Sequence, residues 1–413
     1  MLVLSLEVDS RRWSSSLSMT ILGHRALRFL DDLPKNATDL EVASLLRKTL
    51  SIEQALAASE QYFLRRRALS QRGDDRFLLL TRKGLEQATH PMVAAWRARE
   101  LSRTPARGPF WDATCGLGAD SLALLDQGQS LISSDLDPRT VACAAHNLNE
   151  VASPGARSLV LRCDATERAV RPAGVLIDPD RRKNNRRSLD PSIWSPSMEK
   201  CLEVLKQAEM GCLKLPPSLT PTENLLSLGT LCWVSFEREL KEVALFSGLA
   251  AWDGPPRRVV ALTGAAGEEV LEGEPIRMAP MDPKHVQSVD WLANPDPALL
   301  RSGLLELEAS RHGLRPLAPQ LAWVGGEEQP SSPFFKCKRV LASTRADPRR
   351  VRRMLADHDV GPLDIWKRGH PDSAEVLARR FKGRGSRRAI LAIGRLEEGH
   401  QAWLLDPESG AAH

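Results

Sequence analysis

One stretch of the chain, residues 110–138, constrains the fold more than any other. It reads FWDATCGLGADSLALLDQGQSLISSDLDP. A short apolar run ends in Asp112, and a turn containing Gly116 and Gly118 follows it. A helix then begins, and a second apolar run ends in Asp135. Strand, glycine turn, helix, strand and acid form half of a doubly wound α/β nucleotide-binding fold. The glycines let the backbone approach a ligand closely because they lack a Cβ atom.

The turn differs from a dinucleotide fingerprint, and the difference indicates another ligand. G-x-G-x-x-G would place a third glycine where this chain has Ser121, and its absence disfavours a nicotinamide enzyme. Asp112 and Asp120 flank the turn, and two acids favour a cationic ligand over a phosphate. S-adenosylmethionine has an adenosine, an ammonium and a sulfonium but no phosphate. Asp135 is then placed to accept hydrogen bonds from the ribose hydroxyls.

Composition excludes several classes of protein. A chain of 413 residues with 42% hydrophobic and 26% charged residues is typical of a soluble protein of two or three domains. The seven cysteines show no spacing of a zinc site, so we expect reduced thiols, no bound metal and a cytoplasmic protein. No apolar run approaches the ~18 residues of a membrane span, so we expect no membrane partner.

Charge is unevenly distributed along the chain. Residues 331–400 contain 17 lysines and arginines against 8 aspartates and glutamates, an excess of nine positive charges. The whole chain carries only +5, so the remainder is net acidic. This asymmetry predicts an acidic partner for the C-terminal part.

Further apolar runs extend the predicted sheet after residue 138. We expect strands at 159–163, 174–177, 211–217, 231–236 and 257–264, and helices at 139–149, 191–208 and 237–249. With the first two strands this makes seven. The third strand ends at Asp164 and Ala165, which face the same crevice as Asp135. Asp164 is placed to accept from an adenine amino group, or else it is a simple turn aspartate.

The fourth strand ends in the second most informative stretch, Asp178-Pro179-Asp180-Arg181-Arg182. The proline fixes the backbone directly after the strand. A fixed acid there can orient a nucleophile and accept its proton. Five of the seven residues 181–187 are basic. Arginine suits bidentate contact with phosphate, so this loop either receives a nucleic-acid backbone or is a solvated run of charge.

The segment before the glycine turn offers a wall for the same crevice. The segment spans residues 83–103; Pro91 is placed in the first turn of a helix, and residues 92–101 are amphipathic. Glu86, Gln87, Thr89 or His90 then lines the active site; the alternative is an ordinary capped helix with a solvated start. Upstream, residues 37–82 predict a helical domain with capping boxes at Thr38 and Ser51, and residues 1–36 are poorly defined.

The C-terminal part reads as an α+β module. After a connecting region at 265–330, strands and helices alternate through 331–413, and paired arginines give this module a basic stripe. Aromatic residues are scarce there, which disfavours base stacking on single strands. Recognition of the backbone and shape of folded RNA fits better, and the alternative is a basic domain without a partner.

Taken together, these stretches resemble the class I S-adenosylmethionine-dependent methyltransferases with a C-terminal THUMP-like domain. The resemblance rests on GLEQATHPMVAAWRA, the glycine turn, LIDPDRR, WVSFERELKEVALFSG, and DVGPLDIWKRGHP with RFKGRGSRRAILAIGR. It implies a Rossmann-like seven-stranded sheet at 83–264, a helical N-terminal domain and a THUMP-like domain at 331–413. It also implies RNA, a tRNA or rRNA, as the partner.

Carried over by position, the resemblance assigns three sets of site residues. Cofactor contacts are implied for Asp112, Thr114, Gly116, Gly118, Asp120, Asp135, Asp164 and Ala165. Catalytic roles are implied for Asp178, Pro179 and Arg181. Substrate contacts are implied for Glu86, Gln87, Thr89 and Arg182.

The chain departs from the family pattern at one position. Asp180 stands where RNA methyltransferases often have a second proline, and we expect this to loosen the loop. No cysteine follows this motif, which disfavours a cysteine nucleophile for carbon methylation. Two other functions stay open: methylation of a protein or small molecule, which would not need residues 331–413, and RNA binding without catalysis, which would not need the cofactor.

Overall fold

The computed structural model describes residues 29–30, 32–34, 36–73, 79–105, 107–151, 157–167, 172–183, 186–188, 190–264 and 267–410. For residues 151, 182, 183, 186 and 187 the backbone alone is described. The predicted poorly defined N-terminus lies almost entirely outside these ranges. The chain divides into two compact units, residues 1–219 with 244–252, and residues 220–243 with 253–413.

The first unit begins with the expected helices. They are α3 (Asp39–Arg47), α4 (Ile52–Arg72), α5 (Arg82–Gln87) and α6 (Pro91–Leu101). Thr38 and Ser51 form the predicted capping boxes with Glu41 and Gln54. Val42, Leu46 and Ala58 are fully buried in the core that joins α3 to α4. His90 caps α6, and Pro91 occupies the first turn, where its missing N–H costs nothing.

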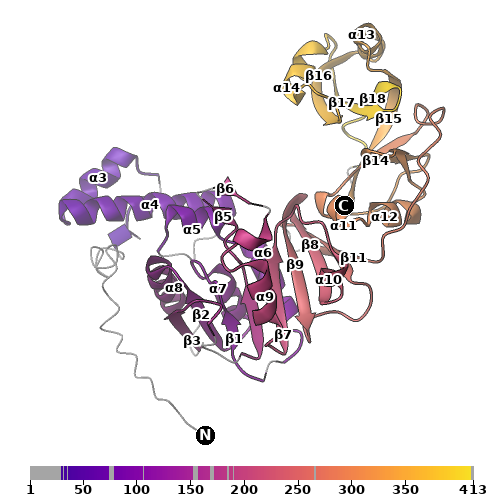
Figure 1. Ribbon diagram of the computed structural model, residues 1–413. Coiled ribbons are helices and arrows are strands. Elements are labelled where there is room, and N and C mark those ends of the chain that lie inside the picture. The colour runs from indigo at the N-terminus through magenta and orange to yellow at the C-terminus, as the bar shows by residue number, and fades with distance from the viewer. Residues whose placement is uncertain are drawn as a thin grey trace. The chain divides into compact units, whose positions relative to one another are not determined.

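Parallel strands form the centre of the first unit (Figure 1). They are β1 (Phe110–Asp112), β2 (Leu131–Asp135), β3 (Ser158–Arg162), β4 (Gly174–Ile177) and β7 (Met210–Leu215), with helices α7 (Ala119–Asp126), α8 (Pro138–Val151) and α9 (Met198–Leu205) between them. β1 pairs in parallel with both β2 and β4, β2 with β3, and β4 with β7. The short strands β5 (Arg182–Lys183) and β6 (Arg186–Arg187) pair with each other, and Pro191–Ile193 form a single helical turn. β1, β4 and β7 are buried throughout, as expected of strands covered on both faces.

The helix predicted at 237–249 is wrong. The residues form strand β9 (Glu239–Gly248), which follows β8 (Gly229–Phe236) through a two-residue turn. Glu237 and Arg238, at φ 49° and 60°, both lie in the left-handed region that such hairpin turns require. Neither is a glycine or asparagine, so the sequence lacks the usual signal. The six residues from Glu242 to Ser247 are buried, and this run decides for a strand.

The large sheet has nine strands in the order β11-β10-β8-β9-β7-β4-β1-β2-β3. The seven predicted strands are β1, β2, β3, β4, β7, β8 and β10 (Arg257–Leu262), and the sheet gains β9 and β11 (Glu268–Glu272) in addition. The strand expected at 257–264 is therefore β10.

The second unit contains α10 (Glu223–Leu226) and a seven-stranded sheet in the order β13-β14-β12-β15-β18-β17-β16. The strands of this sheet are β12 (Trp291–Pro295), β13 (Arg315–Ala318), β14 (Leu321–Gly326), β15 (Phe335–Arg345), β16 (Val360–Arg368), β17 (Arg387–Leu396) and β18 (Gly399–Leu405). The helices between them are α11 (Pro297–Ser302), α12 (Leu305–Arg311), α13 (Pro348–Asp357) and α14 (Ala374–Arg380). The alternation of strands and helices predicted after residue 331 is confirmed. The segment 265–330, which we expected to be a connection, supplies β11 to β14 and two helices.

Alternate residues of β17 fill two different cores. Leu391 and Ile393 pack with α13 and α14 on one face of the sheet. Ile390 and Ala392 pack with Trp323 on the other face. Side chains of a strand alternate between faces, so this unbroken apolar run belongs to a strand buried on both sides.

Candidate active site

The glycine turn lies against the carboxylate that ends β2. Gly116 and Gly118 have φ of +56° and +91°. The Gly116 amide donates to Asp135 Oδ2 at 3.1 Å, and the Asp137 amide donates to Oδ1 at 3.0 Å. Burial raises the pKa of Asp135 above its usual value even though these amides oppose it. The acid thus fixes the turn and stays half-exposed beside it.

Asp112, at the end of β1, is buried at 2% exposure. Ser121 Oγ donates to Asp112 Oδ2 at 2.6 Å, and Ser121 also contacts Ser133. Burial and the nearby charge of Asp120 raise the pKa of Asp112 to about 7. This carboxyl group therefore ties β1 and β2 to α7, and it carries less negative charge than the sequence argument assumed.

Asp120, in the first turn of α7, has its charge matched within the protein. It forms an ion pair with Arg97 of α6, and Lys214 Nζ lies 3.5 Å from its Oδ2. Thr89 Oγ1 donates to the same carboxylate at 2.9 Å. Burial alone raises the pKa of Asp120, but Arg97, Lys214 and this hydrogen bond outweigh it and hold the pKa below its usual range.

Asp178, directly after β4, joins the same cluster. Its amide donates to Thr114 Oγ1 at 2.6 Å. Lys214 Nζ donates to Asp178 Oδ2 at 2.5 Å and to Thr89 Oγ1 at 2.6 Å. Side chains from the ends of β4 and β7, from the first turn of α7 and from the segment before α6 therefore meet at one buried ammonium group.

The loop after Asp178 is firmly held, so the expectation that Asp180 loosens it is wrong. The backbones of Asp180 and Ser195 exchange two hydrogen bonds of 2.9 Å. The Asp180 carboxylate accepts from Lys83 Nζ at 2.8 Å and from Gln87 at 3.4 Å. Backbone pairing and two side chains of α5 thus do what a second proline would do by restricting φ.

Comparisons with known proteins show the family of the chain. Two curated relatives, from two strains of Mycobacterium tuberculosis, carry the name uncharacterized S-adenosylmethionine-dependent methyltransferase. Each is 32% identical over 324 residues, covering 78% of this chain and 86% of the relative. This chain belongs to the S-adenosylmethionine-dependent methyltransferases. The family described as THUMP domain-like matches residues 336–407 of the methyltransferase. A crystal structure named for a methyltransferase of Porphyromonas gingivalis W83 shares its fold, with a TM-score of 0.72 and 20% identity over 94% of this chain and 97% of the other.

S-adenosylmethionine is the cofactor of the methyltransferase, and the turn after β1 fits it. A Cβ atom added at Gly116 would meet no atom within 4 Å, so open space lies in front of this backbone. The half-exposed Asp135 carboxylate stands beside that space. Within the described residues, every helix is too short or too polar to cross a bilayer.

Other predicted site residues of the methyltransferase lie in varied surroundings. Asp164 Oδ1 accepts from the amide and the hydroxyl of Thr166, which is the turn arrangement we kept as the alternative to adenine binding. Ala165 and Pro179 are buried, and Arg181 is half-buried. Glu86 is exposed and lies 4.0 Å from Arg67 of α4, Gln87 is exposed and contacts Asp180, and Thr89 joins the cluster around Lys214. The side chain of Arg182 lies outside the described residues.

Sequence reasoning missed two residues of the methyltransferase, Lys214 and Arg97. Lys214 is 5% exposed on β7, and Arg97 is 1% exposed on α6. Each is a single basic residue inside a run that is otherwise apolar, MGCLKLPP and MVAAWRA. Basic residues are almost never fully buried without a partner, so a lone lysine in a buried strand is itself a signal of a nearby acid.

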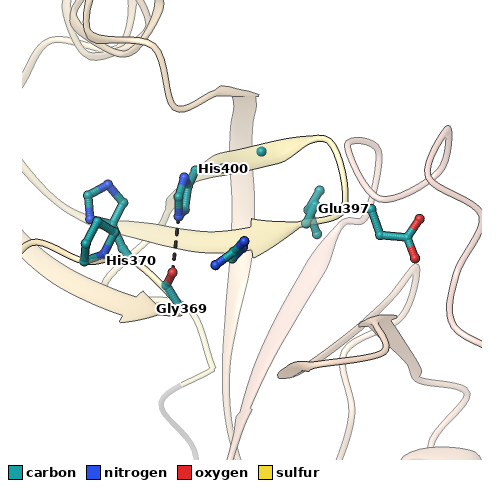
Figure 2. Close-up of a pocket in the computed structure, with 8 residues that line it drawn as sticks. Gly369, His370, Glu397 and His400 are labelled. Atoms are coloured by element: carbon teal, nitrogen blue, oxygen red, sulfur yellow. Dashed lines mark hydrogen bonds between the residues drawn. The ribbon is translucent and has the colours of Figure 1, made fainter.

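The second unit of the methyltransferase has a hollow of about 500 Å³ that is lined in part by residues of the two C-terminal motifs (Figure 2). The rings of His370 and His400 lie 4.6 Å apart on its wall. His400 Nε2 donates to the Gly369 carbonyl at 3.2 Å, and His370 Nδ1 accepts from the Asp372 amide at 3.1 Å. Burial, followed by the neighbouring His400, lowers the pKa of His370. Both rings are therefore held by backbone groups.

Proposed function

We propose that this methyltransferase transfers a methyl group to a base of structured RNA, a tRNA or rRNA. The observation that carries the proposal is that many exposed basic side chains of the second unit have no ion-pair partner among the described residues, among them Arg349, Arg350, Arg352, Lys382, Arg384, Arg387 and Arg395. We call these seven residues the basic face. Exposed arginines and lysines without internal partners suit the phosphates of an RNA backbone.

The loop 382–386 shows how the basic face is built. A Cβ atom at Gly383 would lie 2.1 Å from the Val360 carbonyl oxygen, and one at Gly385 would lie 2.1 Å from the backbone of Asp359. The Gly385 amide donates to the Val360 carbonyl at 2.9 Å. The glycines thus allow this loop to pack directly against Asp359 and Val360 at the start of β16. Lys382 and Arg384 are exposed on the same loop. Phosphate contacts from such a loop would position RNA without reading its sequence.

We propose that the cofactor lies along the carboxyl ends of β1, β2 and β3. Asp135 then binds the ribose, the turn at 114–118 lies against the methionine part, and Asp164 and Ala165 flank the adenine. Asp112, which is buried, and Asp120, which is half-buried, support the turn through their hydrogen bonds and ion pairs. When bound, the cofactor supplies an electrophilic methyl group on its sulfonium.

The acceptor base lies between Asp178 and the segment 87–89 in this proposal. Asp178 accepts a hydrogen bond from the acceptor, Pro179 fixes the carboxylate's direction, and Arg181 and Arg182 hold a nearby phosphate. Positioning of the acceptor in line with the methyl group supplies most of the rate. Gln87 and Thr89 form the wall, and Glu86, which lies near Arg67, contributes at the outer edge.

The test is transfer of labelled methyl from S-adenosylmethionine to total small RNA, with and without prior ribonuclease. We expect label that ribonuclease removes, and nucleoside analysis then names the modified base. Asp178→Asn serves as the matched inactive protein, with transfer reduced by about 100-fold or more. Label in a protein fraction, or transfer that persists without residues 331–413, contradicts the proposal.

A further inference from the structure

Lys214 occupies an unusual place for a lysine. It lies on β7 between Leu213 and Leu215, both fully buried, and its own side chain is 7% exposed. Removing an ammonium from water costs several kcal/mol unless acids surround it. Here Asp178 and Asp120 supply two carboxylates, and Thr89 supplies a hydroxyl. A matched buried charge of this kind serves either the stability of the fold or the geometry of the site.

The contacts of Asp178 favour a role in the site. Lys214 holds Oδ2 of this carboxylate, and Thr114 holds its amide. Its other oxygen, Oδ1, has no hydrogen-bond partner within the described part of the chain, and the side chain is 29% exposed. One oxygen of the carboxylate is therefore held by Lys214, while the other accepts no hydrogen bond from the described residues.

We infer that Lys214 is a positioning residue: it fixes the Asp178 carboxylate so that Oδ1 points at the atom receiving the methyl group. The inference rests on the proposed role of Asp178. An aspartate side chain has two torsions, and without the hydrogen bond from Lys214 the carboxylate can turn its oxygens toward solvent. The hydrogen bond removes this freedom before the acceptor arrives, which lowers the cost of binding the acceptor in line.

The inference predicts that Lys214 strengthens the binding of a cation beside Asp178 by orienting the carboxylate. As a nearby positive charge alone, Lys214 would weaken that binding. Sinefungin is a cofactor analogue in which a carbon bearing an ammonium replaces the methylsulfonium, so its ammonium stands where the transferred methyl would be. S-adenosylhomocysteine lacks that group. The ratio of the two dissociation constants therefore reports how well Asp178 Oδ1 is presented, and no RNA is needed.

The experiment measures this ratio by calorimetry on the full chain. We expect the native protein to prefer sinefungin by about 10- to 100-fold, because a hydrogen bond between two charged groups is worth that much. Asp178→Asn should lose this preference. Lys214→Met should also lose most of it if Lys214 orients the carboxylate. If Lys214 acts only as a nearby positive charge, its removal relieves repulsion and the preference for sinefungin rises.

Two further variants complete the test. Lys214→Gln keeps a donor for Asp178 Oδ2 without the charge and should restore part of the preference; it also replaces Lys214→Met if that variant fails to fold. The double variant Lys214→Met, Asp178→Asn should show no less preference than Asp178→Asn alone, because Lys214 acts through Asp178. Thermal unfolding of each variant confirms that the fold is intact.

The possible outcomes test the role of Asp178 and the role of Lys214 separately. An unchanged preference in Asp178→Asn overturns the proposed role of Asp178 and the inference with it. Loss in Asp178→Asn together with an unchanged or greater preference in Lys214→Met overturns the role of Lys214 alone. The RNA-labelling experiment stands apart from both results.

Discussion

The basic residues of the buried cluster and those of the basic face carry the same charge in opposite settings. Arg97 and Lys214 are buried, and each contacts a carboxylate. Arg349, Arg350 and Arg352 are exposed and have no ion-pair partner within the described residues. A buried charge must be matched, since its desolvation is costly, and the match fixes its geometry. An exposed charge stays hydrated at little cost and can bind a partner's phosphate. The buried, matched charges hold neighbouring side chains in place, whereas the exposed, unmatched charges can attract a binding partner.

The largest effect is expected from breaking the buried cluster. Arg97→Met leaves Asp120 with Lys214 and Thr89 as its partners among the described residues. We expect a loss of about 3–5 kcal/mol in the free energy of unfolding, as for other buried pairs that lose one member. Urea denaturation measures it. Arg388→Met, which breaks the exposed pair with Asp364, is the control and should cost less than about 1 kcal/mol. Equal losses in the two variants would remove the distinction between the settings.

Asp112 adds a third setting to the comparison, because it is a buried acid whose raised pKa favours the protonated, uncharged form. Its pKa is raised from 3.8 to about 7, so the folded state keeps a proton that the unfolded state releases above pH ~4. The stabilisation is complete below that pH and is lost as the pH rises to about 7, at up to about 1.4 kcal/mol per pH unit. Asp112→Asn cannot titrate and should lack this slope. Parallel stability curves for the two proteins between pH 4 and 7 would show that Asp112 is ionised in the fold.

Changes on the basic face should affect binding and leave folding intact. Replacing Arg349, Arg350 and Arg352 together by glutamine should weaken RNA binding by about 10-fold or more and reduce the slope of log affinity against log salt by ~0.7–0.9 for each lost phosphate contact. Stability should change by less than about 0.5 kcal/mol. Arg345→Gln is the matched control, since Arg345 already pairs with Glu398. Fluorescence anisotropy at several salt concentrations measures the affinity and its salt dependence. If the control weakens binding as much as the triple variant, the partnerless arginines have no special role.

The smallest effect is expected at an exposed pair beside the active site. Lys83 is 61% exposed and pairs with Asp180. Lys83→Met should cost less than about 1 kcal/mol of stability, because the backbone pairing of Asp180 with Ser195 still holds the loop. Thermal unfolding measures the shift. A loss as large as that of Arg97→Met would mean that the side chain of Asp180, and not its backbone, anchors this loop.

Much of the fold follows from short-range patterns. The capping boxes at Thr38 and Ser51 depend on hydrogen bonds across three residues, and the glycine turn between β1 and α7 depends on two local backbone conformations. The apolar runs of β4, β7 and β17 identified strands for the same reason. The helix predicted at 237–249 was wrong because its pattern allows both structures, and a turn with two left-handed residues that are not glycine decided between them.

The sequence by itself determined the α/β fold, the glycine turn and the acids that end β1, β2 and β4. Only the tertiary structure decided how those acids are used: that Asp120 pairs with Arg97, that Asp180 is anchored by Ser195 and Lys83, and that Lys214 meets Asp178. The physical reason is distance along the chain. Local hydrogen bonds and side-chain periodicity are written in neighbouring residues, whereas the charge that meets a given carboxylate depends on which strand ends the folded sheet brings together.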